Sequence, residues 1–224
     1  MRQNKYNMNQ YIIMNDVYII GCGGNSKVIV EICELNKYVI KGFFDDKHNL
    51  ARDNGHTKYK IIGTTDDIKN YPRIKIINSI GDNEIRKKIC DKLNGENLNL
   101  EWINCIHPDS HISTTVKLGM GNIICYGSFI NSCVSIGNFN LLNTYSIVEH
   151  DSIICDFNHV APRTTLCGNT FIGNINLLGA SSTFIPNKRI GNKNIIGAMT
   201  LIIDNFGDNN LIVGIPGTIK KKLV

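Results

Sequence analysis

The chain has 224 residues, of which 42% are apolar and 19% charged. This length supports one large domain or two small ones, each with its own core, and it excludes a short peptide or a disordered tail. The net charge of +5 is spread along the chain, so it indicates a solvated surface and no nucleic-acid partner. The eight cysteines form no CxxC pair and no apolar run could cross a bilayer, so we expect reduced cysteines, a cytoplasmic location and no membrane partner.

The first half of the chain reads as an α/β domain. Residues 1–15 precede the first strand-like run, and we expect them to form a loose N-terminal extension. From residue 16 to 105, strand-like apolar runs at 16–20, 39–44, 60–62, 74–78 and 98–103 alternate with helical patterns at 27–36 and 84–93. Strands that alternate with helices predict a small Rossmann-like domain with a parallel sheet.

A glycine-rich turn, GCGGNS at residues 21–26, follows the first of these strands. Such a turn places backbone N–H groups and a helix N-terminus against phosphate. Asp45 ends the second strand, 45 − 21 = 24 residues after Gly21, where a ribose hydroxyl is usually held. Residues 80–84 lie at the same edge of the sheet. Together these features predict a nucleotide site, although a glycine-rich turn can also be a plain tight connection, and Ser26 occupies the last glycine position of the dinucleotide motif.

An apolar residue recurs at every sixth position of the second half, without interruption. The series is Ile106, Ile112, Leu118, Ile124, Ile130, Ile136, Leu142, Val148, Ile154, Val160, Leu166, Ile172, Leu178, Phe184, Ile190, Ile196 and Ile202. A fixed period predicts a solenoid, and six residues fit one short strand of a coil with three strands and 18 residues. We therefore expect the hexapeptide repeat of a left-handed parallel β-helix at 106–203, with the series pointing into a triangular prism and small residues four positions later at the corners.

A β-helix needs its ends closed, and residues 204–224 read as a C-terminal cap and tail. The flat faces of such a solenoid usually pair with further copies. By analogy with this fold we expect a homotrimer.

Two histidines lie well inside the repeats. His150 stands two residues after inward Val148, so its ring points outward, between Glu149 and Asp151. A histidine that is oriented by a carboxylate can act as a general base, although a solvated surface histidine would show the same pattern. His159 directly precedes inward Val160 and also faces outward.

A metal centre is disfavoured. Some left-handed β-helices are carbonic anhydrases, which hold zinc with three histidines across an interface. One coil before and after His150 lie Ser132 and Gly168, and Leu141 and Leu177 stand in the same places around His159. No third ligand is found at the neighbouring corners, so we expect no metal.

From Val17 to Ile215 the chain resembles the bacterial sugar acetyltransferases of the PglD/NeuD type. The resemblance is carried by the glycine-rich α/β domain and by the motifs GDNEIRKK at 81–88, NT at 143–144, IVEHD at 147–151 and FNHV at 157–160. It implies an acetyl-CoA-dependent N-acetyltransferase that acts on the 4-amino group of a 4-amino-4,6-dideoxy sugar. This sugar would be linked to a nucleotide, with UDP as the expected one. The resemblance also implies direct attack without a covalent enzyme intermediate, and active sites between the subunits of a homotrimer.

The resemblance assigns roles to individual residues. His150 is implied as the general base, and Asp151 takes the place of the acid, usually Glu, that raises its basicity; Glu149 is a competing partner. The implied acetyl-CoA groove is lined by His159, Gly168, Gly179, Ala180 and Ala198. The nucleotide-sugar site is implied at Gly23, Gly24, Asn25, Asp45, Asp46, Gly81 and Asn83. Asn25 and Ser26 stand where the family often has a small residue or His, which puts the sugar or base preference in doubt.

Other functions remain open to test. O-acetylation of sialic acid or a related sugar hydroxyl would use the same base, so the catalytic residues do not decide between the two. A trimeric scaffold that binds a nucleotide sugar without catalysis leaves the Glu149–Asp151 segment without a purpose. A dinucleotide-dependent oxidoreductase and a nucleotidyltransferase are disfavoured, because the first half lacks their motifs.

Overall fold

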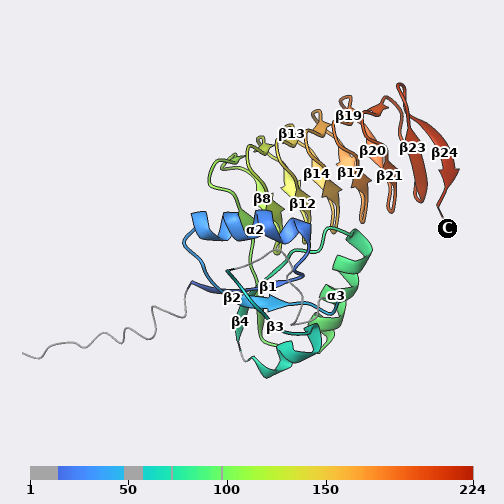
Figure 1. Cartoon of the computed structure of the whole chain (residues 1–224). Helices are drawn as coiled ribbons and strands as arrows, with labels where there is room; N and C mark the ends of the chain where they lie inside the picture. Colours follow the sequence, from blue (N-terminus) through green and yellow to red (C-terminus); the bar gives the residue numbers. More distant parts are fainter. Residues whose placement is uncertain (1–14, 48–57, 72, 97, 224) are drawn as a thin grey trace, which may run out of the picture.

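The computed structural model describes residues 15–47, 58–71, 73–96 and 98–223. The expected N-terminal extension lies outside the described residues, except for Asn15. A mixed α/β part leads into a long stack of short strands that ends at the C-terminus (Figure 1). No helix in the described ranges is long and apolar enough to span a membrane.

The α/β part contains a parallel sheet of five strands in the order β3-β2-β1-β4-β5. Its strands are β1 (Asp16–Ile20), β2 (Val39–Phe44), β3 (Ile61–Gly63), β4 (Ile74–Asn78) and β5 (Leu100–Trp102), and its helices are α2 (Gly24–Leu35), the 3₁₀ helix η1 (Thr65–Asn70) and α3 (Asn83–Gly95). The strand order reverses between β1 and β4, and ligands of such sheets bind at the carboxyl ends of these strands. The Rossmann-like prediction is confirmed.

Helix α2 begins earlier than the sequence pattern indicated. It starts at Gly24 rather than at residue 27, and the backbone N–H of Ser26 already donates to the carbonyl of Gly23, at 3.1 Å. The second half of the glycine-rich turn is therefore the first turn of the helix. This places the N-terminus of α2 at the carboxyl end of β1, where the positive end of a helix dipole favours an anion.

The second half is a β-helix with three parallel sheets, here called sheets 1, 2 and 3. Sheet 1 holds β6 (Cys105–Ile106), β9 (Ile123–Ile124), β12 (Leu141–Leu142), β15 (His159–Val160), β18 (Leu177–Leu178), β21 (Ile195–Ile196), β23 (Asn210–Val213) and the antiparallel β24 (Thr218–Lys222). Sheet 2 holds β7 (His111–Ile112), β10 (Phe129–Ile130), β13 (Ile147–Val148), β16 (Thr165–Leu166), β19 (Thr183–Phe184) and β22 (Leu201–Ile202). Sheet 3 holds β8 (Lys117–Leu118), β11 (Ser135–Ile136), β14 (Ile153–Ile154), β17 (Phe171–Ile172) and β20 (Arg189–Ile190).

The six-residue apolar series forms the interior of the prism. Its members from Ile124 to Ile202 are buried and pack in one cluster, and Ile106, Ile112 and Leu118 pack partly buried at the open N-terminal end. Small residues such as Ser128, Ser146 and Thr164 are buried at the corners. The β-helix prediction is thus confirmed, because a period of six with alternating in and out positions leaves only one way to bury the series.

An asparagine ladder, absent from the sequence-based prediction, runs up one corner of the prism. Its members are Asn104, Asn122, Asn140, Asn158, Asn176, Asn194 and Asn210. The side-chain oxygen of each accepts the backbone N–H of the next, at 2.8–2.9 Å. The ladder satisfies buried backbone groups that the narrow corner hides from water.

We predict that Asn122→Ala lowers the free energy of unfolding by about 1–3 kcal/mol, because it leaves the buried N–H of Asn140 without its acceptor at 2.8 Å. Urea denaturation measures this change. Asn99→Ala, at an exposed asparagine outside the ladder, is the matched control and is expected to stay within ~0.5 kcal/mol of the wild type. Equal denaturation midpoints for the two variants would contradict a structural role for the ladder.

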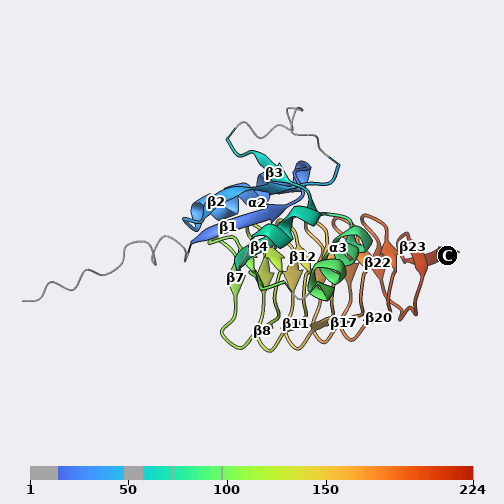
Figure 2. The ribbon, with the colours of Figure 1, turned by 90° about the horizontal axis from the view of Figure 1, so that it is seen from below.

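The α/β part covers only the first coils of sheet 1. Ile29 and Cys33 of α2 pack with Ile123 and Leu141, whose outward side chains are fully buried there. Figure 2 shows the α/β part lying along one side of the β-helix, over its N-terminal coils. Further along sheet 1, the outward side chain of Ile195 is exposed. The edge of this covered region falls at His159, which is half-buried.

Candidate active site

His150 lies at the corner between sheets 2 and 3, in the turn that joins β13 to β14. Four third residues after inward aliphatics adopt a left-handed conformation at this corner, Cys133, Asp151, Asn169 and Asn187, and φ of Asp151 is 60°. Asparagine and aspartate tolerate this conformation better than most residues. The turn brings Oδ2 of Asp151 to 2.8 Å from Nδ1 of His150, and both side chains are about 60% exposed (60% and 62%).

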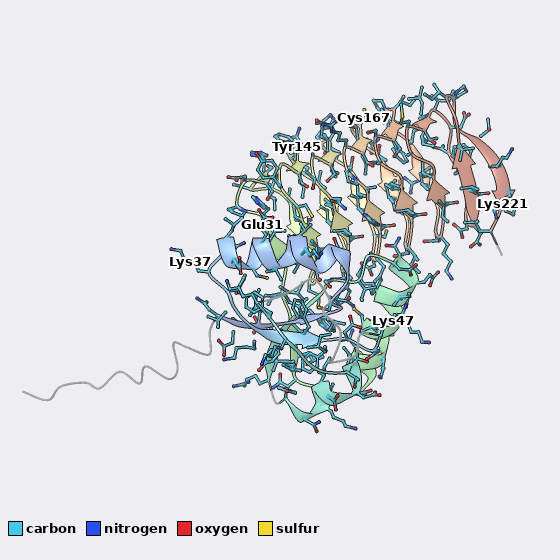
Figure 3. All side chains as sticks on the ribbon, in the orientation of Figure 1. Glu31, Lys37, Lys47, Tyr145, Cys167 and Lys221 are labelled. Carbon is cyan, nitrogen blue, oxygen red and sulfur yellow. The ribbon has the colours of Figure 1, made fainter. Side chains whose placement is uncertain are left out.

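Gly168 lies one coil later, beneath the imidazole of His150. A Cβ atom at Gly168 would sit 2.7 Å from both Cε1 and Nε2 of His150, closer than real Cβ atoms approach other atoms. The Gly168 backbone φ is not in the left-handed region, so the glycine is needed for space rather than for its conformation. Cys167, directly before Gly168, lies on the edge of the β-helix that faces away from α2 and α3 (Figure 3).

Glu149 points its carboxylate elsewhere. Its Oε2 accepts a hydrogen bond from Nδ2 of Asn131, one coil earlier, at 2.7 Å. Of the two carboxylates that flank His150 in the sequence, Asp151 therefore contacts the imidazole and Glu149 contacts Asn131.

The carboxylates expected to bind the nucleotide sugar make hydrogen bonds within the chain. Asp45 accepts the backbone N–H of Cys22 at 2.6 Å and that of Lys47 at 2.8 Å. Asp46 accepts the backbone N–H of Thr65 at 2.7 Å and its hydroxyl at 2.9 Å. These bonds shape the loops at the carboxyl edge of the sheet.

The glycines of the same edge border open space. Among the described residues, and apart from chain neighbours, no atom lies within 4 Å of the position that a Cβ would take at Gly23, Gly24 or Gly81. Asn25 at the start of α2 donates its side-chain amide to the carbonyl of Ser79 at 2.9 Å, which ties the ends of β1 and β4 together. The N-terminus of α2 thus opens onto space beside an edge whose loops are fixed by hydrogen bonds.

A cavity of about 430 Å³ lies where residues 81–84 meet sheet 1. His159, Leu177 and Ile195 line it from sheet 1, and Asn83 anchors its wall by donating to the carbonyl of Asn176 at 2.9 Å. Lys193 forms a salt bridge of 3.4 Å with Glu84, and both line the cavity. The cavity joins Gly81 and Asn83, expected at the nucleotide sugar, to His159, expected in the acetyl-CoA groove.

His159 is held as a neutral imidazole. Burial, and then the charge of Arg86, lower the pKa of His159 to about 4, although a hydrogen bond to the Gly81 backbone works in the opposite direction. Its Nε2 lies 3.3 Å from the side-chain nitrogen of Asn143.

The remaining expected groove residues lie at another corner. Gly179, Ala180 and Ala198 are in turns between sheets 1 and 2, whereas Gly168 and His150 are at the corner between sheets 2 and 3. In a triangular prism the corner between sheets 2 and 3 is opposite sheet 1, which carries His159 and the α/β part. One chain therefore does not bring the His150–Asp151 pair to the cavity.

The described residues show no group of three or more His, Cys, Asp or Glu side chains arranged to hold a metal ion. All eight cysteines are free thiols, five of them buried. Burial raises the pKa of the Cys90 and Cys125 thiols to about 12, so neither forms a reactive thiolate near neutral pH.

Comparison with known proteins identifies a domain and structural relatives of the chain. Residues 16–93 match the PglD N-terminal domain. A perosamine N-acetyltransferase from Caulobacter crescentus, crystallised as a histidine variant with CoA and GDP-perosamine, is 27% identical, with a TM-score of 0.84 over 93% of this chain and 98% of that one. The acetyltransferase domain of PglB from Neisseria gonorrhoeae FA1090 is 26% identical, with a TM-score of 0.84 over 92% of this chain and 99% of that domain.

A curated relative is an uncharacterized protein of Acanthamoeba polyphaga mimivirus, 38% identical over 108 residues. The match covers 48% of this chain, and the chain spans only about a fifth (21%) of that protein. The fold, the matched N-terminal domain and the two structural relatives agree with the resemblance seen in the sequence. The chain has a PglD N-terminal domain at residues 16–93 and, over 92–93% of its length, it resembles a perosamine N-acetyltransferase and the acetyltransferase domain of PglB.

Proposed function

We propose that this protein transfers the acetyl group of acetyl-CoA to the 4-amino group of a 4-amino-4,6-dideoxy sugar linked to a nucleoside diphosphate, UDP in the first instance. The His150–Asp151 pair above Gly168 is the observation that carries the proposal. Its support comes from the match over 93% of the chain to an N-acetyltransferase crystallised with CoA and GDP-perosamine. In this proposal residues 16–105 bind the nucleotide sugar, 106–203 carry the acyl transfer, and 204–224 cap the β-helix.

The proposed chemistry is general base catalysis by His150. Asp151 accepts a hydrogen bond from Nδ1, which leaves Nε2 free to take a proton from the sugar amine as its nitrogen attacks the thioester carbon. The Gly168 backbone N–H, beside the ring, is the proposed donor to the tetrahedral oxyanion. Collapse of this intermediate breaks the C–S bond and leaves the amide, and the His150 imidazolium returns its proton to the departing CoA sulfur, which leaves as the thiol. Holding amine and thioester together removes much of the entropic barrier, and no covalent enzyme intermediate is required.

The substrates would approach from opposite sides of the chain. We place the nucleotide sugar at the carboxyl edge of the sheet and the adjoining cavity, with the phosphates at the N-terminus of α2. The proposed residues are Gly23, Gly24, Asn25, Asp45, Asp46, Gly81 and Asn83. Because the carboxylates of Asp45 and Asp46 already accept backbone N–H groups, we assign them to shaping this edge.

A second copy of the chain would complete the site. The corner that carries His150 lies opposite sheet 1, so the pair can reach a cavity only on a neighbouring chain. A hollow of about 600 Å³ on sheet 2, lined by Phe129, Tyr145, Ile147 and Arg163 among others, offers an exposed apolar face next to that corner. We therefore propose a homotrimer with acetyl-CoA between adjacent β-helices, where Gly168 of one chain and His159, Gly179, Ala180 and Ala198 of the next would line the groove.

A thiol-release assay with acetyl-CoA tests the proposal. The acceptor panel is the UDP-, dTDP- and GDP-linked 4-amino-4,6-dideoxy sugars, with and without a 2-acetamido group, together with free and CMP-linked sialic acid. Turnover of one amino sugar by a preparation that light scattering sizes as three chains is the expected result. If sialic acid is the one acceptor that is acetylated, the proposed N-acetylation is wrong and O-acetylation takes its place. If none of the acceptors gives thiol release, the non-catalytic scaffold becomes the better explanation. Full activity of a single chain would contradict an active site shared between chains.

A further inference from the structure

Arg86 is a buried cation of α3, with an exposed fraction of 1%. It forms no salt bridge within the described ranges, and the nearest acidic groups that affect it are the Cys90 thiol and Asp82. Burial lowers the pKa of Arg86 to about 10, which still leaves the guanidinium charged at neutral pH. A buried arginine is rare unless its donors are all used, so its hydrogen bonds explain its position.

The guanidinium donates to groups in both halves of the chain. In the α/β part its hydrogen bonds are accepted by the carbonyls of Ile80 and Gly81 and by Oδ1 of Asn83. In the β-helix they are accepted by the carbonyls of Phe139, Phe157 and Asn158. The six donor–acceptor distances are 2.7–3.3 Å. Asn158 directly precedes His159, and Gly81 hydrogen bonds to its ring. Arg86 therefore joins the two walls of the cavity at the point where His159 enters it.

The contacts of His159 fit a neutral ring. Oδ1 of Asn143 accepts the backbone N–H of Thr144 at 2.8 Å, so the amide nitrogen of Asn143 faces the imidazole. An amide nitrogen only donates, and it lies 3.3 Å from Nε2 of His159, which in this arrangement accepts and carries no proton. Nδ1 is then the ring nitrogen left to donate to the Gly81 backbone.

We propose that Arg86 is a positioning residue for the cavity: its guanidinium fixes residues 80–83 and the backbone before His159 as one wall. Burial, and then the charge of Arg86, lower the pKa of the His159 ring held against this wall. The other charged groups that line the cavity are Asp82, Glu84 and Lys193, of which the last two pair with each other. A diphosphate would therefore meet the same wall at any pH between about 5 and 8, because His159 does not titrate in this range.

Ring NMR of histidine-labelled protein tests the assignment without reference to activity. In the wild type, His159, identified by its loss in His159→Gln, is expected as the Nδ1–H tautomer and neutral down to pH ~5. In Arg86→Met its pKa is expected to rise by about 1, toward the ordinary value of 6.5. Arg86→Lys keeps the charge and is expected to keep the ring neutral. Lys88→Met, which removes an exposed cation from the same helix, is the control and leaves His159 unchanged.

Two results would overturn the proposal. One is a wild-type His159 that titrates near 6.5, a measurement that stands even where Arg86→Met does not fold. The other is a folded Arg86→Met protein in which His159 still titrates at the wild-type pH, because burial alone would then account for the neutral ring.

Calorimetry with UDP gives the functional readout, and this part rests on the proposed function. The wild type and Lys88→Met are expected to share one pH dependence of the Kd between pH 5.5 and 7.5, set by the terminal phosphate of UDP, whose pKa lies near 6. The Kd of Arg86→Met is expected to be weaker at pH 7.5 and to tighten on acidification relative to the wild type, as a protonated His159 meets the diphosphate. Arg86→Lys separates position from charge, with a weaker Kd that follows the pH dependence of the wild type. If UDP binds none of these proteins while the NMR result holds, the proposed nucleotide fails and the role of Arg86 in holding His159 stands.

Discussion

His150→Ala is expected to lower kcat for acetyl transfer by about 10²–10⁴-fold, the usual contribution of a general base. The imidazole is the group that the structure orients, through the bond of 2.8 Å from Nδ1 to Asp151, and its other nitrogen faces solvent beside Gly168. Steady-state thiol release with the sugar nucleotide selected in the acceptor panel measures the loss. Because we place the phosphates at the N-terminus of α2 and let His150 act only on the sugar amine, the Kd for that nucleotide is expected to be unchanged.

The two neighbouring carboxylates supply the internal comparison. Asp151→Asn is expected to lower kcat by up to about fivefold, since the exposed pair with His150 is weak. Glu149→Gln is the matched control, because a glutamine oxygen can still accept from Asn131 and the imidazole loses no partner. If Glu149→Gln lowers kcat more than Asp151→Asn does, Glu149 and not Asp151 is the carboxylate that assists His150. Full activity of His150→Ala would contradict the proposed mechanism.

The repeat makes most of the β-helix predictable from the sequence. A period of six fixes which residue of each strand points inward, so the same period also places His150 and His159 on the outside of the prism. The choice between Glu149 and Asp151 is beyond this pattern. It depends on the left-handed turn at Asp151 and on Asn131, which lies 18 residues before Glu149 and comes alongside it only when the coils stack.

The carboxyl edge of the α/β sheet was predicted in place but not in detail. The end of β2 lies beside the glycine-rich turn, yet the carboxylate of Asp45 is bonded to the backbone of that turn itself. The burial of Arg86 was not predicted from the sequence. A basic residue in an amphipathic helix ordinarily faces water, and the carbonyls that bury this one belong to coils 53 to 72 residues further along the chain.

The separation of His150 from His159 follows from the same geometry. The resemblance grouped Gly168 with His159 in one groove, whereas in a single chain one lies at the corner between sheets 2 and 3 and the other on sheet 1. Spacing along the sequence gives the face of the prism but not the packing of one prism against another. The groove can be a single site only if the two halves come from different chains.

Gly168→Ala is expected to cost about 10²-fold in kcat without loss of stability. The added methyl would sit 2.7 Å from Cε1 and Nε2 of His150, so the imidazole must move aside by a large fraction of an ångström. A displacement of about 1 Å at a catalytic group can cost 10²-fold. The ring is 60% exposed and can move into water, and an alanine at this backbone conformation restricts the unfolded chain. The free energy of unfolding is therefore expected to stay the same or to rise by about 0.4–1 kcal/mol.

Gly207→Ala is the control for this prediction, because a Cβ at Gly207 of the same β-helix meets no atom within 4 Å. Its kcat is expected to match the wild type, and its stability to change in the same direction as that of Gly168→Ala. Kinetics and urea denaturation of both variants separate a displaced base from a damaged fold. A Gly168→Ala protein with wild-type kcat would mean that acetyl transfer does not need the imidazole where the structure holds it, and the assignment of His150 as the base would fall with it.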